Sequence, residues 1–73
     1  MDNDHTLQIR MSLVRLLDVS TRKRMLVKAL MTNLRNNRTN NAHLMSQISE
    51  IINSEIMELE RLLDECHVAA TQE

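Results

Sequence analysis

The segment Asn36-Asn37-Arg38-Thr39-Asn40-Asn41 separates two long stretches of sequence that contain no Gly or Pro. Asparagine is unfavourable inside a helix, but it tolerates the left-handed backbone that ends helices, and it caps the start of new ones. We therefore expect a turn at residues 36–41, with Asn36 or Asn37 ending one helix. The chain of 73 residues also lacks Phe, Tyr and Trp, and this composition argues against a β-rich fold.

The stretch before the turn repeats apolar residues at alternating spacings of four and three, which is the heptad pattern of a coiled coil. The expected seam of this first helix consists of Ile9, Leu13, Leu16, Val27, Leu30 and Leu34. Ser20 and Lys23 occupy the polar positions in the middle of the seam. Asn3 or Asp4 is a suitable N-cap, so residues 1–4 are assigned to the cap and residues 5–35 to the helix.

The stretch after the turn shows the same spacing, and Thr39, Asn40 or Asn41 can cap its start. The expected seam of this second helix consists of Met45, Ile48, Ile52, Leu59, Leu62 and Cys66, with Ala69 after them and Glu55 as the polar interruption. We assign residues 42–69 to this helix and expect residues 70–73 to fray. An alternative with three helices would break the first one at residues 19–21, but the heptad phase continues unchanged across Ser20.

Charge is divided unequally between the two stretches. Residues 1–40 have a net charge of +5 and residues 41–73 a net charge of −6, although the whole chain has a net charge of −1. Folding the chain back at residue 39 pairs positions whose numbers sum to about 78, which sets the basic helix against the acidic one. The predicted fold is therefore an all-α, antiparallel two-helix coiled-coil hairpin.

In this register Lys23 lies opposite Glu55, so the polar interruptions of the two seams meet. A buried polar pair can fix the register of a coiled coil at some cost in stability, and Lys23 and Glu55 are the candidates for that role. The alternative is that both side chains extend from the edge of the seam into solvent. Arg15 is expected near Glu60 or Asp64.

Both helices have apolar residues outside their seams. The candidate partner face consists of Leu7, Met11, Val14, Met25, Ala29, Ile56 and Leu63. A single hairpin would leave these side chains exposed, and large exposed apolar patches usually mark interfaces. Small folds of this kind commonly need oligomerisation. We therefore expect a four-helix bundle, formed with a second copy or with the helices of another protein.

Nothing in the sequence predicts a catalytic, metal or cofactor site, or a small-molecule substrate. Cys66 and His67 are adjacent, so in a helix they point about 100° apart, and Cys66 at a seam position is expected to be a small core residue. No set of about four metal ligands has suitable spacing. The expected function is that of a non-enzymatic protein-interaction or scaffold subunit, a small component of a larger coiled-coil assembly.

The main alternative function is that of a nucleic-acid-binding regulator. Arg22, Lys23, Arg24 and Lys28 form a basic cluster that could follow a phosphate backbone. The net charge of −1 and the lack of aromatic side chains for base stacking favour a protein partner instead. No signal peptide or transmembrane stretch is recognisable, so we expect a cytoplasmic or nuclear protein without membrane association.

Overall fold

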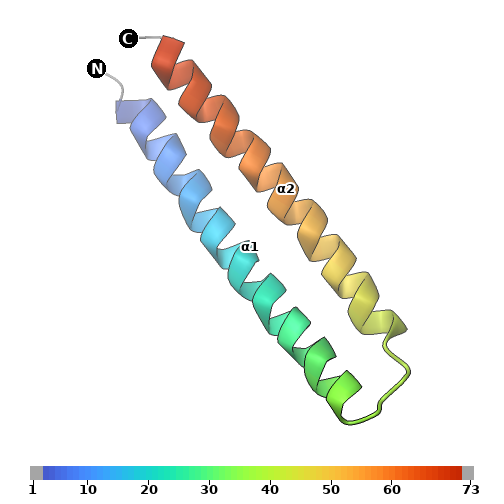
Figure 1. The fold of residues 1–73 in the computed structure, drawn as a ribbon. Helices are drawn as coiled ribbons and strands as arrows, with labels where there is room; N and C mark the ends of the chain where they lie inside the picture. Colours follow the sequence, from blue (N-terminus) through green and yellow to red (C-terminus); the bar gives the residue numbers. More distant parts are fainter. Residues whose placement is uncertain (1–2, 72–73) are drawn as a thin grey trace.

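The computed structural model describes residues 3–71, which form an all-α helical hairpin (Figure 1). Helix α1 comprises Asn3–Arg35 and helix α2 comprises Ala42–Thr71. The helices are antiparallel, so the two ends of the chain lie at the same end of the molecule (Figure 1). The predicted two-helix fold is confirmed. Helix α1 continues through residues 19–21, which excludes the alternative with a break at Ser20.

The helix boundaries differ slightly from those that the sequence predicted. Helix α1 begins two residues earlier, at Asn3, and α2 ends two residues later, at Thr71. Residues 1–2 of the predicted cap and residues 72–73 of the predicted tail lie outside the described residues. Asp4 is in the first turn of α1, where a carboxylate interacts favourably with the positive end of the helix dipole.

A Schellman motif centred on Asn37 ends α1. Asn37 has a φ of 58°, in the left-handed region that Asn adopts more readily than most residues. The Arg38 N–H donates to the Asn33 carbonyl at 2.8 Å, and the Asn37 N–H donates to the Leu34 carbonyl at 3.1 Å. These are the two hydrogen bonds that define the motif, so Asn37 does what Gly does in many other helices.

Asn41 connects the turn to the start of α2. Its carbonyl accepts a hydrogen bond from the Met45 N–H at 2.9 Å. Its side chain, only 8% exposed, donates from Nδ2 to the Arg38 carbonyl at 2.9 Å and accepts from Asn33 Nδ2 at 3.0 Å. These bonds tie the last turn of α1 to the first residues of α2, so the Asn-rich segment closes the hairpin.

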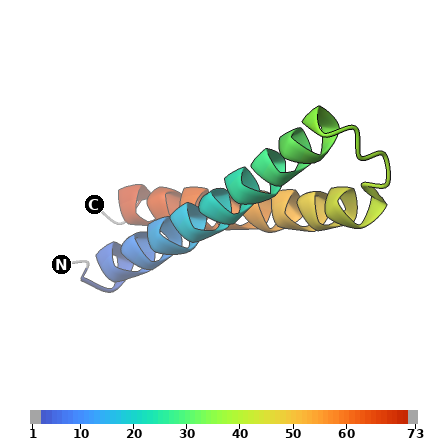
Figure 2. The same cartoon turned by 90° about the horizontal axis from the view of Figure 1, so that it is seen from below.

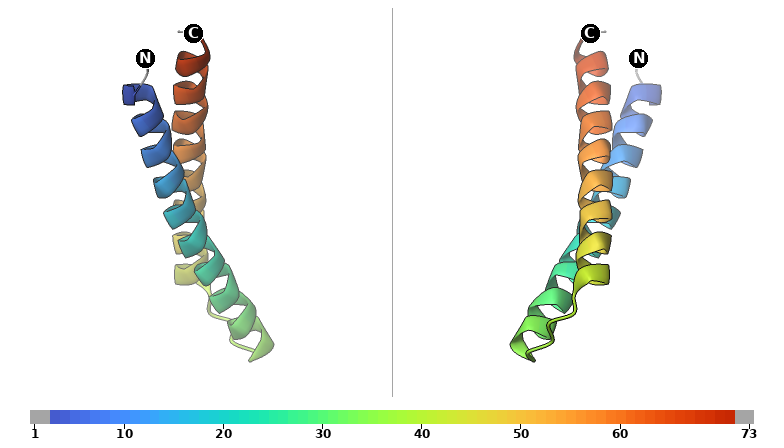
Figure 3. Two further views of the ribbon diagram at one scale, coloured as in Figure 1. Left: turned by 90° about the vertical axis from the view of Figure 1, so that its left-hand side faces the viewer. Right: turned by 90° about the vertical axis from the view of Figure 1, so that its right-hand side faces the viewer.

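The two helices cross obliquely near their middles instead of lying parallel throughout (Figures 2 and 3). The molecule is an elongated rod whose Cα atoms extend over 56 × 14 × 13 Å. Its one line of helix contact encloses very little. Among the described residues, Val19, at 8% exposed, is the only buried apolar side chain. The hairpin therefore has almost no hydrophobic core of its own.

The residues that face the other helix recur at spacings of four and three, and we call them the inner seam. In α1 they are His5, Ile9, Ser12, Leu16, Val19, Lys23, Leu26, Leu30 and Asn33, all buried or half-buried. In α2 and the residue before it they are Asn41, Leu44, Ile48, Ile51, Glu55, Glu58, Leu62, Glu65 and Ala69. This regular spacing keeps the two helices in contact along their length.

The inner seam has the predicted period but differs from the predicted seam at every second position. The predicted seam residues that are exposed instead are Leu13, Val27, Leu34, Met45, Ile52, Leu59 and Cys66. The residue immediately before each of them lies on the inner seam instead. Ile9, Leu16, Leu30, Ile48 and Leu62 are half-buried on the seam. At four of these positions the residue on the inner seam is polar (Ser12, Asn33, Glu58 and Glu65), so the predicted seam took the more apolar neighbour, which faces outward.

Candidate interaction face

Polar side chains interrupt the inner seam near its middle, where Lys23 meets Glu55. Lys23 Nζ donates to both carboxylate oxygens of Glu55, at 2.7 and 2.8 Å, and Ser20 Oγ donates to Glu55 Oε2 at 2.6 Å. These hydrogen bonds, with the nearby positive charge, hold the pKa of Glu55 below its ordinary value of 4.5. Both side chains are partly buried, so the pair joins the two helices across the seam.

A second polar cluster lies closer to the chain ends. Arg15 Nε donates to Glu58 Oε2 at 3.1 Å, and another nitrogen of the same guanidinium donates to Ser12 Oγ at 3.3 Å. Arg61 donates to the other carboxylate oxygen of Glu58 at 2.9 Å. Ser12, although polar, is only 1% exposed. Arg15 was expected near Glu60 or Asp64, and it contacts Glu58, which precedes both of them in α2.

The inner seam is therefore almost half polar. His5 Nδ1 lies 3.7 Å from Glu65 Oε2 near the chain ends, and Asn33 contacts Asn41 near the turn. Every buried side-chain nitrogen and oxygen in residues 4–71 has a hydrogen-bond partner. This network defines the pairing of the helices, but polar contacts of this kind add modest net stability. The apolar residues that usually hold a hairpin together lie elsewhere.

Helix α2 presents a second heptad stripe to solvent, which we call the α2 strip. It consists of Ala42, Met45, Ser49, Ile52, Ile56, Leu59, Leu63, Cys66 and Ala70, again at spacings of three and four, and all of them are exposed. Ser49 is the only polar member. The inner seam of the same helix includes three glutamates. The more hydrophobic stripe of α2 is thus the one that is exposed in the hairpin.

Helix α1 has a less continuous stripe of the same kind, which we call the α1 strip. Its exposed apolar members are Leu13, Leu17, Val27, Met31 and Leu34. Arg10, Ser20 and Arg24 occupy the intervening positions at the same spacing. The exposed fractions of the apolar members range from 39% for Val27 to 68% for Leu17.

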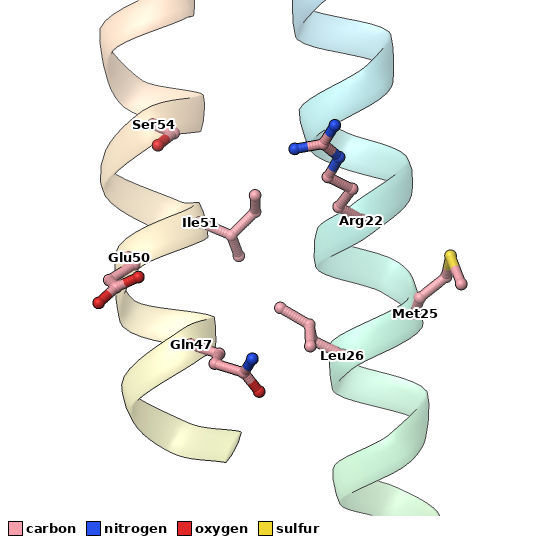
Figure 4. Close-up of a pocket in the computed structure, with 7 residues that line it drawn as sticks. All are labelled: Arg22, Met25, Leu26, Gln47, Glu50, Ile51 and Ser54. Atoms are coloured by element: carbon pink, nitrogen blue, oxygen red, sulfur yellow. The ribbon is translucent and has the colours of Figure 1, made fainter. Parts of the chain in front are cut away.

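The two strips lie on the same side of the hairpin. A shallow groove of about 380 Å³ marks the other side, between the helices. It is lined by Arg22, Met25, Leu26, Gln47, Glu50, Ile51 and Ser54. Figure 4 shows Leu26 and Ile51 directed toward each other across this space. At 100° per residue, the groove residues of each helix flank one edge of its inner seam and the strip residues flank the other. Together the strips form one surface, the apolar face.

The candidate partner face that the sequence suggested is not one surface. Ile56 and Leu63 belong to the α2 strip, but Leu7, Met11, Val14, Met25 and Ala29 are exposed on other sides of α1. Met11 and Val14, with Arg10 and Arg15, border a small hollow of about 260 Å³ on α1 alone. The sequence did not separate these two groups because it does not show which side of α1 faces α2.

The basic cluster considered for nucleic-acid binding is partly engaged within the hairpin. Lys23 is bound to Glu55, and Arg22 lies 3.2 Å from the Asp18 carboxylate in an exposed pair. Arg24 and Lys28 are exposed, and no ion pair of theirs is found within residues 3–71. Two of the four cations therefore already have an acidic partner.

We also searched the described residues for a metal site and for a membrane-spanning helix. No three His, Cys, Asp or Glu side chains in residues 3–71 are grouped so as to hold a metal ion. Neither α1 nor α2 combines the length and apolar character of a membrane-spanning helix. Cys66 is an exposed thiol on the α2 strip. No family model, curated protein or solved structure matches the chain.

The lowered pKa of Glu55 predicts a pH-dependent contribution to stability. Because the carboxylate binds its proton less readily when folded, its stabilising effect is present above the ordinary pKa and is lost as pH falls through the lowered one. We expect Glu55→Gln to melt below the wild type at neutral pH, and this gap to shrink as pH falls below about 4.5. Glu50→Gln, at an exposed position beside the groove on the other side of the hairpin, should show little gap at any pH. A gap for Glu55→Gln that did not change with pH would contradict the assignment.

Proposed function

We propose that this chain is a non-enzymatic interaction subunit that assembles with other α-helices through its apolar face. Its role is then that of a small structural component of a helical assembly. The α2 strip is the observation that carries this proposal. An exposed and nearly uninterrupted heptad stripe along a helix is the pattern that packs against partner helices in coiled coils and bundles.

The amount of apolar surface that the hairpin leaves exposed supports the same proposal. Met45, Ile52, Ile56, Leu59 and Leu63 are large and at least 39% exposed. Covering the part of these five side chains that is still exposed contributes roughly 5 kcal/mol before the entropy lost on association. Within the hairpin, Val19 is the only buried apolar side chain among the described residues, and the other apolar residues of the inner seam are half-buried. The α2 strip therefore offers hydrophobic stabilisation that the single hairpin does not use.

The proposal includes a cytoplasmic or nuclear location, where the single cysteine, Cys66, would remain a free thiol. Nucleic-acid binding by α1 is the competing function. It predicts binding that weakens steeply with salt and on neutralising Arg22, Arg24 and Lys28. The competing function would be favoured if the chain bound nucleic acid in this salt-sensitive way and were also fully helical as a single chain.

Dilution of the purified chain tests the proposal. If the apolar face must be covered, the isolated hairpin is only partly folded, so helicity measured by circular dichroism is low in dilute solution. Helicity and melting temperature then rise with chain concentration or, if another protein supplies the helices, stay low at every concentration. A single chain that is fully helical, with a melting temperature independent of concentration, would overturn the proposal. Mass should be followed by light scattering with refractive-index detection, because the chain has no Trp or Tyr.

A further inference from the structure

We infer that the apolar face is covered by a second copy of this chain, in a two-fold symmetric four-helix bundle whose two turns lie at the same end. This inference rests on the proposed function and adds to it the occupant of the face and its orientation. A two-fold interface joins the same patch of both subunits, so that patch must be complementary to itself. Both the extent and the charge of the hairpin meet this requirement.

The extent of the face matches what a stable dimer buries. The long dimension of the rod is 56 Å and its width is 14 Å. One long face therefore covers on the order of 800 Å², which is about the area that each partner buries in a standard interface. The face runs along both helices and is apolar over most of this length, as homodimer interfaces are.

Charge selects between the two ways of stacking one hairpin on another. Within the described residues, α1 has seven basic and two acidic residues, a net charge of +5, and α2 has one basic and six acidic, a net charge of −5. A two-fold axis parallel to the helices places α1 of each copy against α2 of the other, with both turns at one end. A two-fold axis perpendicular to the helices places α1 against α1 and α2 against α2. Only the first arrangement pairs opposite charges.

Arg10 lies on the α1 strip, and its neighbours in the second copy differ between the two stacking arrangements. Asn33 contacts Asn41, so position 10 of α1 is level with about position 64 of α2, and Glu60 lies about one turn from that level. With both turns at one end, Arg10 of each copy approaches Glu60 of the other. With the turns at opposite ends, Arg10 instead approaches Lys28, since these two residues are equally far from the ends of α1. Like charges would then meet in the interface.

Cross-linking of the native thiol tests both the occupant and the orientation. Cys66 is the only cysteine of the chain and lies on the α2 strip near the chain ends. With both turns at one end, the two copies of Cys66 lie in the same layer of the bundle. With the turns at opposite ends, they are separated by roughly 28 Å, at 1.5 Å per residue. We expect a short bismaleimide to join two native chains efficiently and to leave Cys66→Ser uncrosslinked.

A displaced thiol provides the matched control for orientation. Met45→Cys combined with Cys66→Ser moves the thiol along the same strip to the turn end. With both turns at one end, this variant cross-links to itself, and mixing it with the native chain adds little mixed product. With the turns at opposite ends, the mixed product dominates and neither chain cross-links to itself efficiently. That second outcome would overturn the orientation.

Charge reversal and mass complete the test. We expect a solution mass of two chains, a several-fold weaker association for Arg10→Glu, and recovery of most of that loss when Glu60→Arg is added to the same chain. A mass of two chains with no such recovery would overturn the pairing of α1 with α2. A chain that stays poorly helical and single at every concentration would overturn the second copy as occupant while leaving the proposed function standing. A single chain that is fully helical would overturn both.

Discussion

Replacing Ile56 by Glu is expected to abolish assembly and, with it, most of the helicity of the chain. Ile56 lies at the centre of the α2 strip and is 47% exposed in the hairpin. In an assembled bundle the substitution removes a buried aliphatic side chain and leaves a carboxylate away from water. A cost of about 3 kcal/mol weakens association roughly a hundredfold. Light scattering should report a single chain at concentrations where the wild type is assembled.

The adjacent residue provides a matched control. Met57 is 55% exposed, but it lies 100° around the helix from Ile56, outside the strip. In an isolated hairpin the two substitutions to Glu should be about equally tolerated, since both side chains point largely into solvent. We expect Met57→Glu to keep the mass and the helicity of the wild type. Equal behaviour of the two variants would show that the strip is not an interface.

Replacing Lys23 alone by Met is expected to destabilise the hairpin more than replacing Lys23 and Glu55 together. Alone, Lys23→Met removes the positive charge beside the partly buried Glu55 carboxylate and leaves Ser20 of α1 as its remaining hydrogen-bond partner. With both residues changed to Met, the middle of the seam becomes apolar, and such replacements of an ion pair are often neutral or stabilising. The single variant should melt below the wild type and the double variant at or above it.

An exposed ion pair serves as the control for this experiment. Asp18 and Arg22 pair on the surface of α1, with both side chains more than 60% exposed, and surface pairs contribute about 0–1 kcal/mol. Arg22→Met should therefore change the melting temperature little. Independent increases in melting temperature for Lys23→Met and Glu55→Met, with no change in the solution mass, would contradict a role of the pair in setting register.

The fold could be predicted because its determinants are local. The absence of Gly and Pro and the heptad spacing indicate helices, and the Asn-rich turn divides them into two. The meeting of Lys23 with Glu55 could also be anticipated, since it follows from the turn position and from the opposite charges of the two helices. Long side chains also reach across small differences in register, which makes this kind of prediction tolerant of error.

The phase of the inner seam could not be predicted in the same way, and the apolar face depends on it. Each helix has more than one apolar stripe, so periodicity alone does not show which of them faces inward. Ser12 and Asn33 lie on the seam because Arg15, one turn along α1, and Asn41, across the hairpin turn, satisfy their hydrogen bonds. Such pairings become visible only in three dimensions. The less polar neighbours of these residues, Leu13 and Leu34, were the natural choice from sequence.

The polar inner seam also bears on how long such a chain survives in a cell. Opening the hairpin breaks hydrogen bonds that water can replace and exposes little additional apolar surface, so an unassembled chain has little to keep it closed. Proteases that cleave transiently open chains act in proportion to the open population. Copies without a companion would then be degraded first. The amount of the protein in a cell would follow the number of its completed assemblies more closely than its rate of synthesis.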